Sequence, residues 1–180
     1  MPSPLDLGLS SGDVRYCWPM SFTARTGAYS AYIAGTEGFE SSCNMYRVTT
    51  DDPGRWNESP QEVLEPTIPG LDWDAQGAVS NSVVEFDGVH YMFYVGFGNW
   101  SQQGSIRFTR NHYLGLAVSE DGGDTWERWS DVQLPVHTTA EGEINMVAAR
   151  RIGSRIHLWI EDSYEGETGI GYFLFHPDEL

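Results

Sequence analysis

Carboxylates that could act as a catalytic pair occur in the last third of the chain. Glu141 and Glu143 flank a glycine, and Asp162 ends the apolar run that follows. Two carboxyl groups about 5 to 9.5 Å apart can hydrolyse a glycosidic bond, one as the acid and the other as nucleophile or base. We expect Glu143 or Glu141 to be the acid and Asp162 to be the second carboxylate. Three earlier carboxylates are alternatives to Asp162: Asp72, Asp74 and Glu85.

The acidic composition supplies a competing interpretation of these carboxylates. The chain has 26 acidic and 10 basic residues and a formal charge of -16, so each candidate could instead be a solvated loop charge. The same charge repels phosphate backbones and anionic lipid. We therefore expect a carbohydrate ligand and neither nucleic acid nor a membrane as partner.

Tryptophan side chains could bind a sugar in such a site. An indole can stack on the C–H face of a sugar ring while nearby polar groups bind the hydroxyls. We assign this role to Trp18, Trp73 and Trp100, with core packing as the alternative. Trp100 lies in residues 98–113, a stretch longer than ordinary hairpin connections, which predicts a binding loop.

A pair of arginines follows the acidic segment. Arg150 and Arg151 are adjacent on a predicted strand and therefore point to opposite faces. We expect Arg150 to face the site, where its guanidinium could bind a substrate carboxylate or Glu143. An internal salt bridge is the alternative.

The sequence has no motif that indicates a metal site, a cofactor or a membrane anchor. The five histidines have no ligand spacing, so no cofactor or transition metal is expected, and a Ca²⁺ ion held by oxygen ligands stays open. No apolar run reaches the roughly 20 residues that span a bilayer. The N-terminus lacks the basic and apolar regions of a signal peptide. We expect a cytoplasmic protein, with a secreted mature form as the alternative.

The elements that must position these residues repeat along the chain. Residues 82–97, 114–129 and 132–135 match 20–35, 44–59 and 63–66 in pattern, and 143–162 with 169–180 begin a third copy. β-Branched and aromatic residues alternate with polar ones around turns such as Asp87-Gly88, which predicts short antiparallel strands. We predict one all-β domain, residues 1–180, with three four-stranded, blade-like units of the β-propeller type (about 14–66, 78–135 and 141–180), the third lacking its outer strand. A β-sandwich is the alternative.

Residues 119–126, SEDGGDTW, fit the pattern S-x-D-x-G-x-T-W at every defined position. This segment resembles the Asp box of sialidases and related propellers. Asp121 can accept hydrogen bonds from turn amides, Gly122 and Gly123 permit positive φ, and Trp126 can pack under the turn. The motif is structural, so it supports the fold rather than a reaction.

A wider pattern, VVEFDGVHYMFYVGF followed by LGLAVSEDGGDTW, resembles the five-bladed propeller glycosidases, the superfamily of arabinanases, xylosidases and levansucrases. The resemblance implies a carbohydrate pocket on the ring axis, with carboxylates at the beginnings of the innermost strands. Glu141-Gly142 resembles the dipeptide that carries the general acid in that superfamily. Trp18 and Asn81 lie where the first two units would have carboxylates, and we assign both to substrate binding.

Two functional classes follow from these features. The first is a glycoside hydrolase-like protein that acts on a glycan at the axial face, and the alternative is a non-catalytic, lectin-like glycan-binding module. Three blades do not close a ring, because known propellers have four to eight. We therefore expect a homodimer that completes the propeller, in which residues 14–17 supply the strand missing from the partner. The rival is a fragment of a larger five-bladed enzyme.

Overall fold

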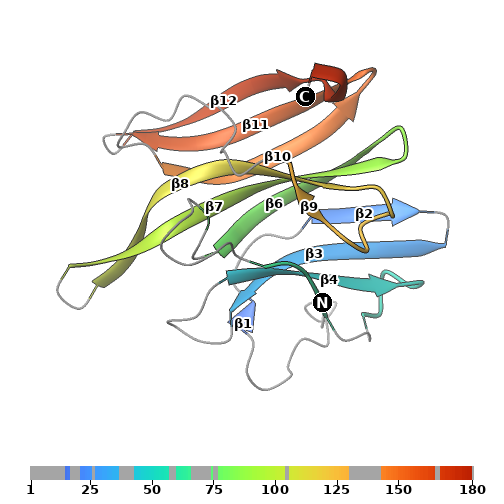
Figure 1. The fold of residues 1–180 in the computed structure, drawn as a ribbon, viewed down its shortest axis with the longest axis horizontal. Helices are drawn as coiled ribbons and strands as arrows, with labels where there is room; N and C mark the ends of the chain where they lie inside the picture. The colour runs from blue at the N-terminus through green and yellow to red at the C-terminus, as the bar shows by residue number, and fades with distance from the viewer. Residues whose placement is uncertain are drawn as a thin grey trace, which may run out of the picture.

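The computed structural model of the chain is almost entirely β-structure, as the sequence predicts. It describes residues 15–16, 21–25, 27–36, 43–56, 60–65, 74, 77–103, 106–129, 143–164 and 167–179. Within these residues the chain forms twelve strands and one 3-10 helix, η1 (Pro177–Glu179). None of the described helical structure is long and apolar enough to cross a bilayer. Figure 1 shows three groups of strands in a row, and we call them blade one (bottom of the view), blade two and blade three (top).

Blade one contains β2 (Ser21–Arg25), β3 (Ala28–Thr36), β4 (Cys43–Thr50) and β5 (Gln61–Leu64), each antiparallel to the next. A short strand, β1 (Arg15–Tyr16), pairs with β3 at Thr36 and Gly35. The sequence predicted that this segment would join a partner chain. It pairs within its own chain instead, because β2 pairs with β3 only as far as Tyr32 and leaves the end of β3 open on that side.

Blade two contains β6 (Gly77–Phe86), β7 (Val89–Gln103), β8 (Ile106–Ser119) and β9 (Glu127–Arg128), in this spatial order. Asp87 at φ 51° and Gly88 at φ 90° form the predicted turn between β6 and β7. Positive φ at both central residues is the geometry that matches the twist of a two-residue hairpin. A single parallel bridge between Cys43 and Gly77 joins blade two to blade one.

The prediction of a binding loop at residues 98–113 is wrong. These residues are the distal half of a long β7–β8 hairpin, in which Trp100 pairs with Thr109 and the ladder continues to Gln103 and Ile106. Aromatic and branched residues occur in both halves of the segment, among them Trp100, Ile106 and Phe108. That composition favours strands over a loop.

Blade three contains β10 (Glu143–Ile152), β11 (Arg155–Tyr164) and β12 (Glu167–Phe175). Its hairpin turn has Gly153 at φ 64°. In the described part of the chain, the sheet order is β10-β11-β12 and no fourth strand follows β12. This agrees with the predicted lack of an outer strand.

The main hydrophobic core lies between the blades. It includes Tyr32 and Met45 of blade one, Phe93 of blade two, and Leu158 and Ile160 of blade three. Alternation along each strand sends neighbouring side chains to opposite faces. A second cluster, formed by Ala31, Ile33, Tyr46, Val48 and Trp56, therefore covers the face of blade one that points away from blade two.

Candidate functional site

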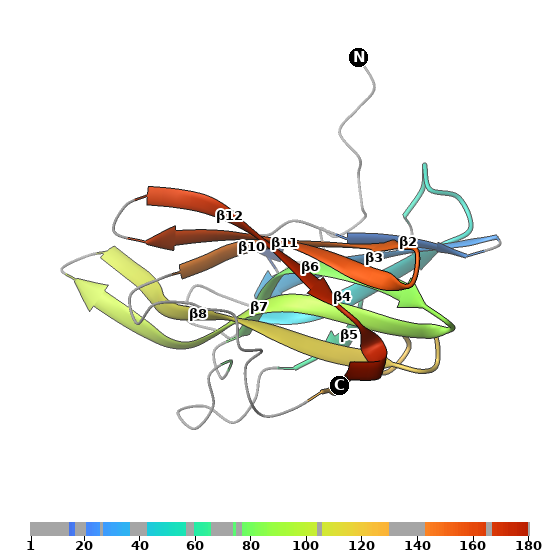
Figure 2. The same ribbon diagram turned by 90° about the horizontal axis from the view of Figure 1, so that it is seen from above.

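The innermost strands of the three blades lie side by side. Ser21 Oγ donates to Asn81 Oδ1 at 2.7 Å and accepts from the Val83 amide at 3.2 Å, which joins β2 to β6. Ser82 Oγ accepts from the Ala149 amide at 2.8 Å, which joins β6 to β10. Figure 2 shows β2 and β10 toward the upper side of the view and β5 toward the lower side. The predicted order of inner and outer strands is therefore present in the described part of the chain.

The beginnings of β6 and β10 lie at the same edge of the molecule. Arg151, close to the hairpin turn of blade three, forms an ion pair of 2.9 Å with Asp87 in the hairpin turn of blade two. Because the two turns are neighbours, β6 and β10 run in the same direction and their first residues share the opposite edge. We call this opposite edge, with the adjacent end of β11, the start edge.

Polar groups gather at the start edge of blade three. His112 Nδ1 lies 3.1 Å from the Ile144 carbonyl oxygen, which connects β8 to β10. Asn145 Nδ2 donates to Ser163 Oγ at 2.8 Å, and that hydroxyl lies 3.1 Å from Thr168 Oγ1. Asp162 pairs with Ile144 across the ladder at the same edge, and its side chain projects from the opposite face of β11 to that of Ser163.

Asp162 has the most unusual environment of the predicted catalytic residues. Its Oδ1 atom is buried and has no hydrogen-bond partner among the described residues. A buried carboxylate oxygen without a partner costs free energy, since it loses its water and gains nothing in return. Such an atom in a folded protein therefore points to a ligand or a reaction rather than to stability.

The structure brings part of the predicted site together at this edge. Glu143 begins β10 and pairs with Ser163, one position from the pair formed by Ile144 and Asp162. Trp100 lies on the part of β7 that extends past the beginning of β6, since Gly77 pairs with Phe97. Three of the predicted site residues lie outside the described residues: Trp18, Trp73 and Glu141.

Asn81 and Arg150 lie elsewhere. Asn81 is buried between blades, where its amide bonds to Ser21 and to the Tyr32 carbonyl at 3.3 Å. Arg150 is exposed near the hairpin end of β10, seven residues from Glu143, which corresponds to about 23 Å along a strand. Neither residue is near Asp162, because one is fixed in a blade contact and the other is at the opposite end of its strand.

The alternative carboxylates have structural contacts. Glu85 Oε1 accepts from the Gly88 amide at 2.7 Å and so supports a hairpin turn. Asp74 is completely buried, and its Oδ2 accepts from Tyr94 Oη at 2.9 Å and from Arg128 Nε at 2.8 Å. Burial raises the pKa of Tyr94, which stays a donor. Asp72 lies outside the described residues.

The turn at residues 119–126 has the geometry that its sequence predicts. Asp121 accepts hydrogen bonds from the amides of Asp124 and Thr125, both at 2.9 Å, and from Thr125 Oγ1 at 2.6 Å. These bonds, led by that of the Thr125 hydroxyl, hold the pKa of Asp121 well below its usual range. Gly122 and Gly123 have φ of 90° and 92°, and Trp126 is buried below the turn.

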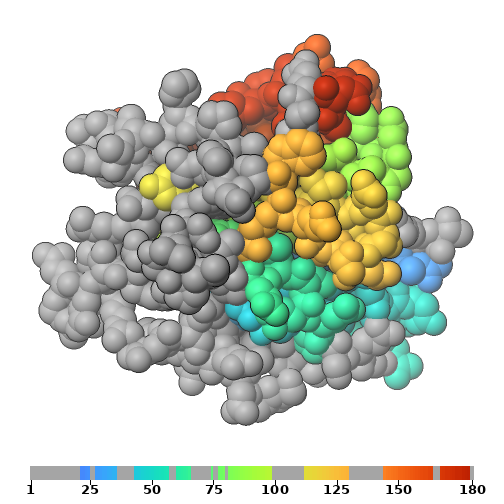
Figure 3. Space-filling view, in the orientation of Figure 1, coloured from blue at the N-terminus to red at the C-terminus, as the bar shows by residue number. Residues whose placement is uncertain are grey.

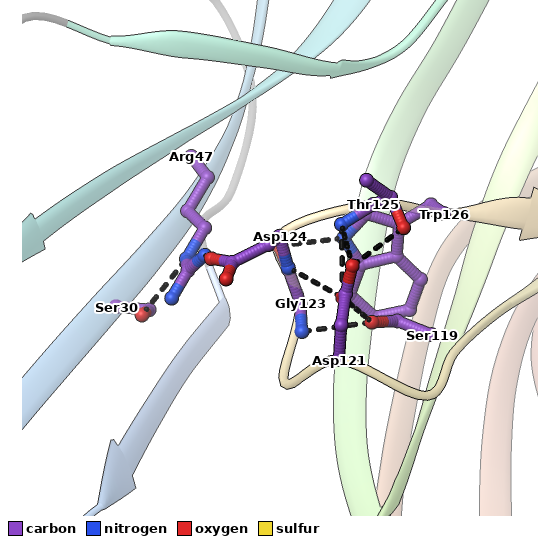
Figure 4. Close-up of polar contacts among 8 residues, drawn as sticks. All are labelled: Ser30, Arg47, Ser119, Asp121, Gly123, Asp124, Thr125 and Trp126. Carbon is purple, nitrogen blue, oxygen red and sulfur yellow. Dashed lines mark hydrogen bonds and ion pairs between the residues drawn. The ribbon is translucent and has the colours of Figure 1, made fainter.

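This turn also joins two blades, which the sequence did not reveal. Arg47 of β4 forms an ion pair with Asp124 and donates from Nε to Ser30 Oγ at 3.1 Å (Figure 4). Figure 3 shows the turn at the surface beside the residues of blade one. A hollow of about 430 Å³ opens at the turn, lined by turn residues such as Asp121, by Arg128 of β9 and by Trp129, which follows β9. It belongs to the outer strands and not to the start edge.

The described residues contain no group of three or more His, Cys, Asp or Glu side chains that could hold a metal ion.

Comparison with solved structures identifies the fold. The chain is similar to Zg3597, a family 117 glycoside hydrolase of the marine bacterium Zobellia galactanivorans, at 13% identity and a TM-score of 0.70 over 92% of this chain and 54% of that one. A thermostable family-43 glycoside hydrolase gives 14% identity and a TM-score of 0.64, over 87% and 56%. An alpha-L-arabinofuranosidase from Lactobacillus brevis gives 14% and 0.61, over 88% and 53%. Neither a known protein-family profile nor a curated protein matches the sequence.

These similarities bear on the architecture only. The chain spans about half the length of each of these enzymes. Its blades do not close into a ring, because in the described part no strand covers the outward face of blade one or the face of blade three that carries Trp159 and Tyr172. The chain therefore has the propeller-type fold of glycoside hydrolases, in the form of three consecutive blades.

Proposed function

We propose that this protein is a carbohydrate-active, glycoside hydrolase-like propeller protein whose glycan site is the start edge of blades two and three. One observation carries the proposal: the buried Oδ1 of Asp162 has no hydrogen-bond partner among the described residues. The fold shared with glycoside hydrolases supports it, because the family resemblance of the sequence implies carboxylates at the beginnings of innermost strands.

In this proposal Glu143 or Glu141 is the general acid, and Asp162 is the nucleophile or base. Glu143 begins β10 and Asp162 lies on the adjacent strand, one position out of register. A glycosidase pair has its carboxyl groups roughly 5 to 9.5 Å apart, and this is the separation that the proposal requires between Asp162 and the acid. Trp18, Trp73 and Trp100 would stack on sugar rings, and residues 119–126 would be an Asp box with a structural role.

The experiment compares binding and turnover in the same set of proteins. The unsubstituted chain and the variants Glu143→Gln, Glu141→Gln and Asp162→Asn are tested on a glycan array and with a panel of aryl glycosides. We expect turnover that falls by roughly 100-fold or more in Asp162→Asn and in one of the two glutamate variants. The stability of Asp162→Asn in urea should be nearly unchanged, because Oδ1 has no hydrogen bond among the described residues to lose.

Glu161→Gln is the matched control, since Glu161 neighbours Asp162 but projects from the opposite face of β11. Its turnover should stay within about twofold of that of the unsubstituted chain, as for surface charges in general. Turnover that survives in Asp162→Asn would contradict the proposed role of Asp162. Array binding without any turnover would replace the hydrolase by a lectin-like protein.

A further inference from the structure

The outward face of blade three carries a cluster of exposed apolar side chains. Most of the large apolar side chains that are exposed in the described part of the chain belong to this blade, among them Ile152 (50%), Ile170 (76%) and Tyr172 (52%). They lie on one face, because the ladder pairs Trp159 with Tyr172 and His157 with Leu174. Exposed apolar patches of this kind mark surfaces that bind another protein segment.

An aromatic cluster occupies the centre of this face. The rings of His157 and Trp159 are stacked with centroids 6.2 Å apart, and Trp159 lies 5.8 Å from Tyr172. Tyr172 Oη lies 2.6 Å from His157 Nδ1. The Tyr172 hydroxyl and one His157 ring nitrogen are thus paired with each other, and the rings present their apolar surfaces to an incoming partner.

The structural repeat indicates which kind of surface would cover this face. The pairs Arg25↔Ala28, Phe86↔Val89 and Ile152↔Arg155 close the first hairpin of each blade. Counted from these pairs, the fifth residue of the second strand is Tyr32 in blade one, Phe93 in blade two and Trp159 in blade three. The three aromatic residues are therefore equivalent in the structure, where blades one and two align one residue away from the sequence match of 20–35 with 82–97.

Two of these equivalent residues are covered by the next blade. Tyr32 and Phe93 are each 0% exposed. Tyr32 lies edge-on to Trp126 of blade two, at 5.6 Å and 89°, and Phe93 lies edge-on to Phe175 of blade three, at 5.2 Å and 84°. Trp159 is 36% exposed. Trp159 thus occupies the repeat position that, in the other two blades, is covered by the next blade.

The opposite end of the row offers a matching surface. The outward face of blade one carries the second apolar cluster, in which Trp56 contacts Phe22 at 5.9 Å, and Phe22 is 53% exposed. Trp56 is the residue of blade one that matches Trp126 of blade two in the sequence repeat. A blade one placed after blade three could thus cover Trp159 much as blade two covers Tyr32.

We infer that a second copy of this chain binds to the outward face of blade three through the outward face of its blade one. Two such contacts, related by a two-fold axis, close a ring of six blades, which lies within the four to eight of known propellers. The chain spans about half of the enzymes it resembles, and a second copy restores a closed ring. This inference rests on the fold and is independent of the proposed function.

The oligomeric state tests it directly. Light scattering coupled to gel filtration should give the mass of two chains for the unsubstituted protein. Trp159→Glu and Phe22→Glu, at opposite ends of the row, should each give the mass of one chain, because either substitution buries a charge in both contacts. The dimer should tighten as salt rises, because two chains of formal charge -16 repel each other.

Trp129→Glu is the matched control, because Trp129 is 47% exposed but belongs to blade two and to neither outward face. It should remain a dimer. Tyr172→Glu, on the same face as Trp159, should be monomeric, and near-ultraviolet circular dichroism checks that each variant is folded. A dimer that survives Phe22→Glu would contradict the pairing of blade three with blade one. A monomeric unsubstituted chain would overturn the inference and point to a further blade as the occupant.

Discussion

Arg128 Nε lies 2.8 Å from Asp74 Oδ2, and the Asp74 side chain is completely buried. This ion pair connects the outer strand of blade two to the segment that leads into β6. Removing one partner of such a pair leaves a charge that has lost its water and found no replacement.

Asp74→Asn should therefore lower the free energy of unfolding by about 3 kcal/mol, as measured by urea denaturation. Asp87→Asn is the control, because the Arg151–Asp87 pair is largely exposed. It should cost less than about 1 kcal/mol. Equal losses in the two variants would show that burial of the Asp74 pair does not matter.

Gly123 is required by the contact between blades one and two. Its φ is +92°, and a Cβ atom there would lie 2.1 Å from Tyr32 Oη. Gly153 also has positive φ, +64°, but a Cβ atom there would meet nothing within 4 Å. Gly123→Ala should therefore lower the stability in urea by about 1 to 3 kcal/mol more than Gly153→Ala does. Equal effects would mean that only the backbone conformation matters.

Asp121 makes the stability of the turn depend on pH. Its pKa is lowered in the folded protein by the bonds from Thr125 and Ser119. A carboxyl group with a lowered folded pKa stabilises above its unfolded pKa of about 3.9, and this contribution is lost as the pH falls below that value. Asp121→Asn should have a lower urea midpoint than the unsubstituted chain at pH 7, and the gap should narrow at pH 3. Glu120→Gln, an exposed neighbour, should show little difference at pH 7.

Asn81 is predicted to act between the blades. Asn81→Ala removes the acceptor of Ser21 Oγ and the donor to the Tyr32 carbonyl. We expect a loss of about 2 kcal/mol in urea denaturation, because buried polar partners are left without hydrogen bonds. Ser163→Ala is the control at the start edge and should cost less, since its bond to Asn145 is only partly buried. An unchanged stability in Asn81→Ala would favour the substrate role that the sequence suggested.

Several features of this protein could be predicted from the sequence because they are local. The turn at Asp87-Gly88 follows from two residues that tolerate positive φ, and the turn at residues 119–126 follows from the order of Asp121, its glycines and Trp126. The three copies of the strand pattern predicted the three groups of antiparallel strands. The length of residues 98–113 suggests a loop, but they extend the β7–β8 ladder as far as Gln103 and Ile106, because Trp100, Ile106 and Phe108 favour strands.

The contacts between blades were decided only by the tertiary structure. The sequence alone does not indicate that the next blade buries Tyr32 and Phe93, whereas Trp159 stays exposed. Nor does it distinguish Asp74, which is paired with Arg128, from Asp162, which keeps a buried oxygen without a partner among the described residues. Strand patterns report short-range preferences, whereas burial and charge pairing depend on which segments, 50 or more residues apart, come to lie together.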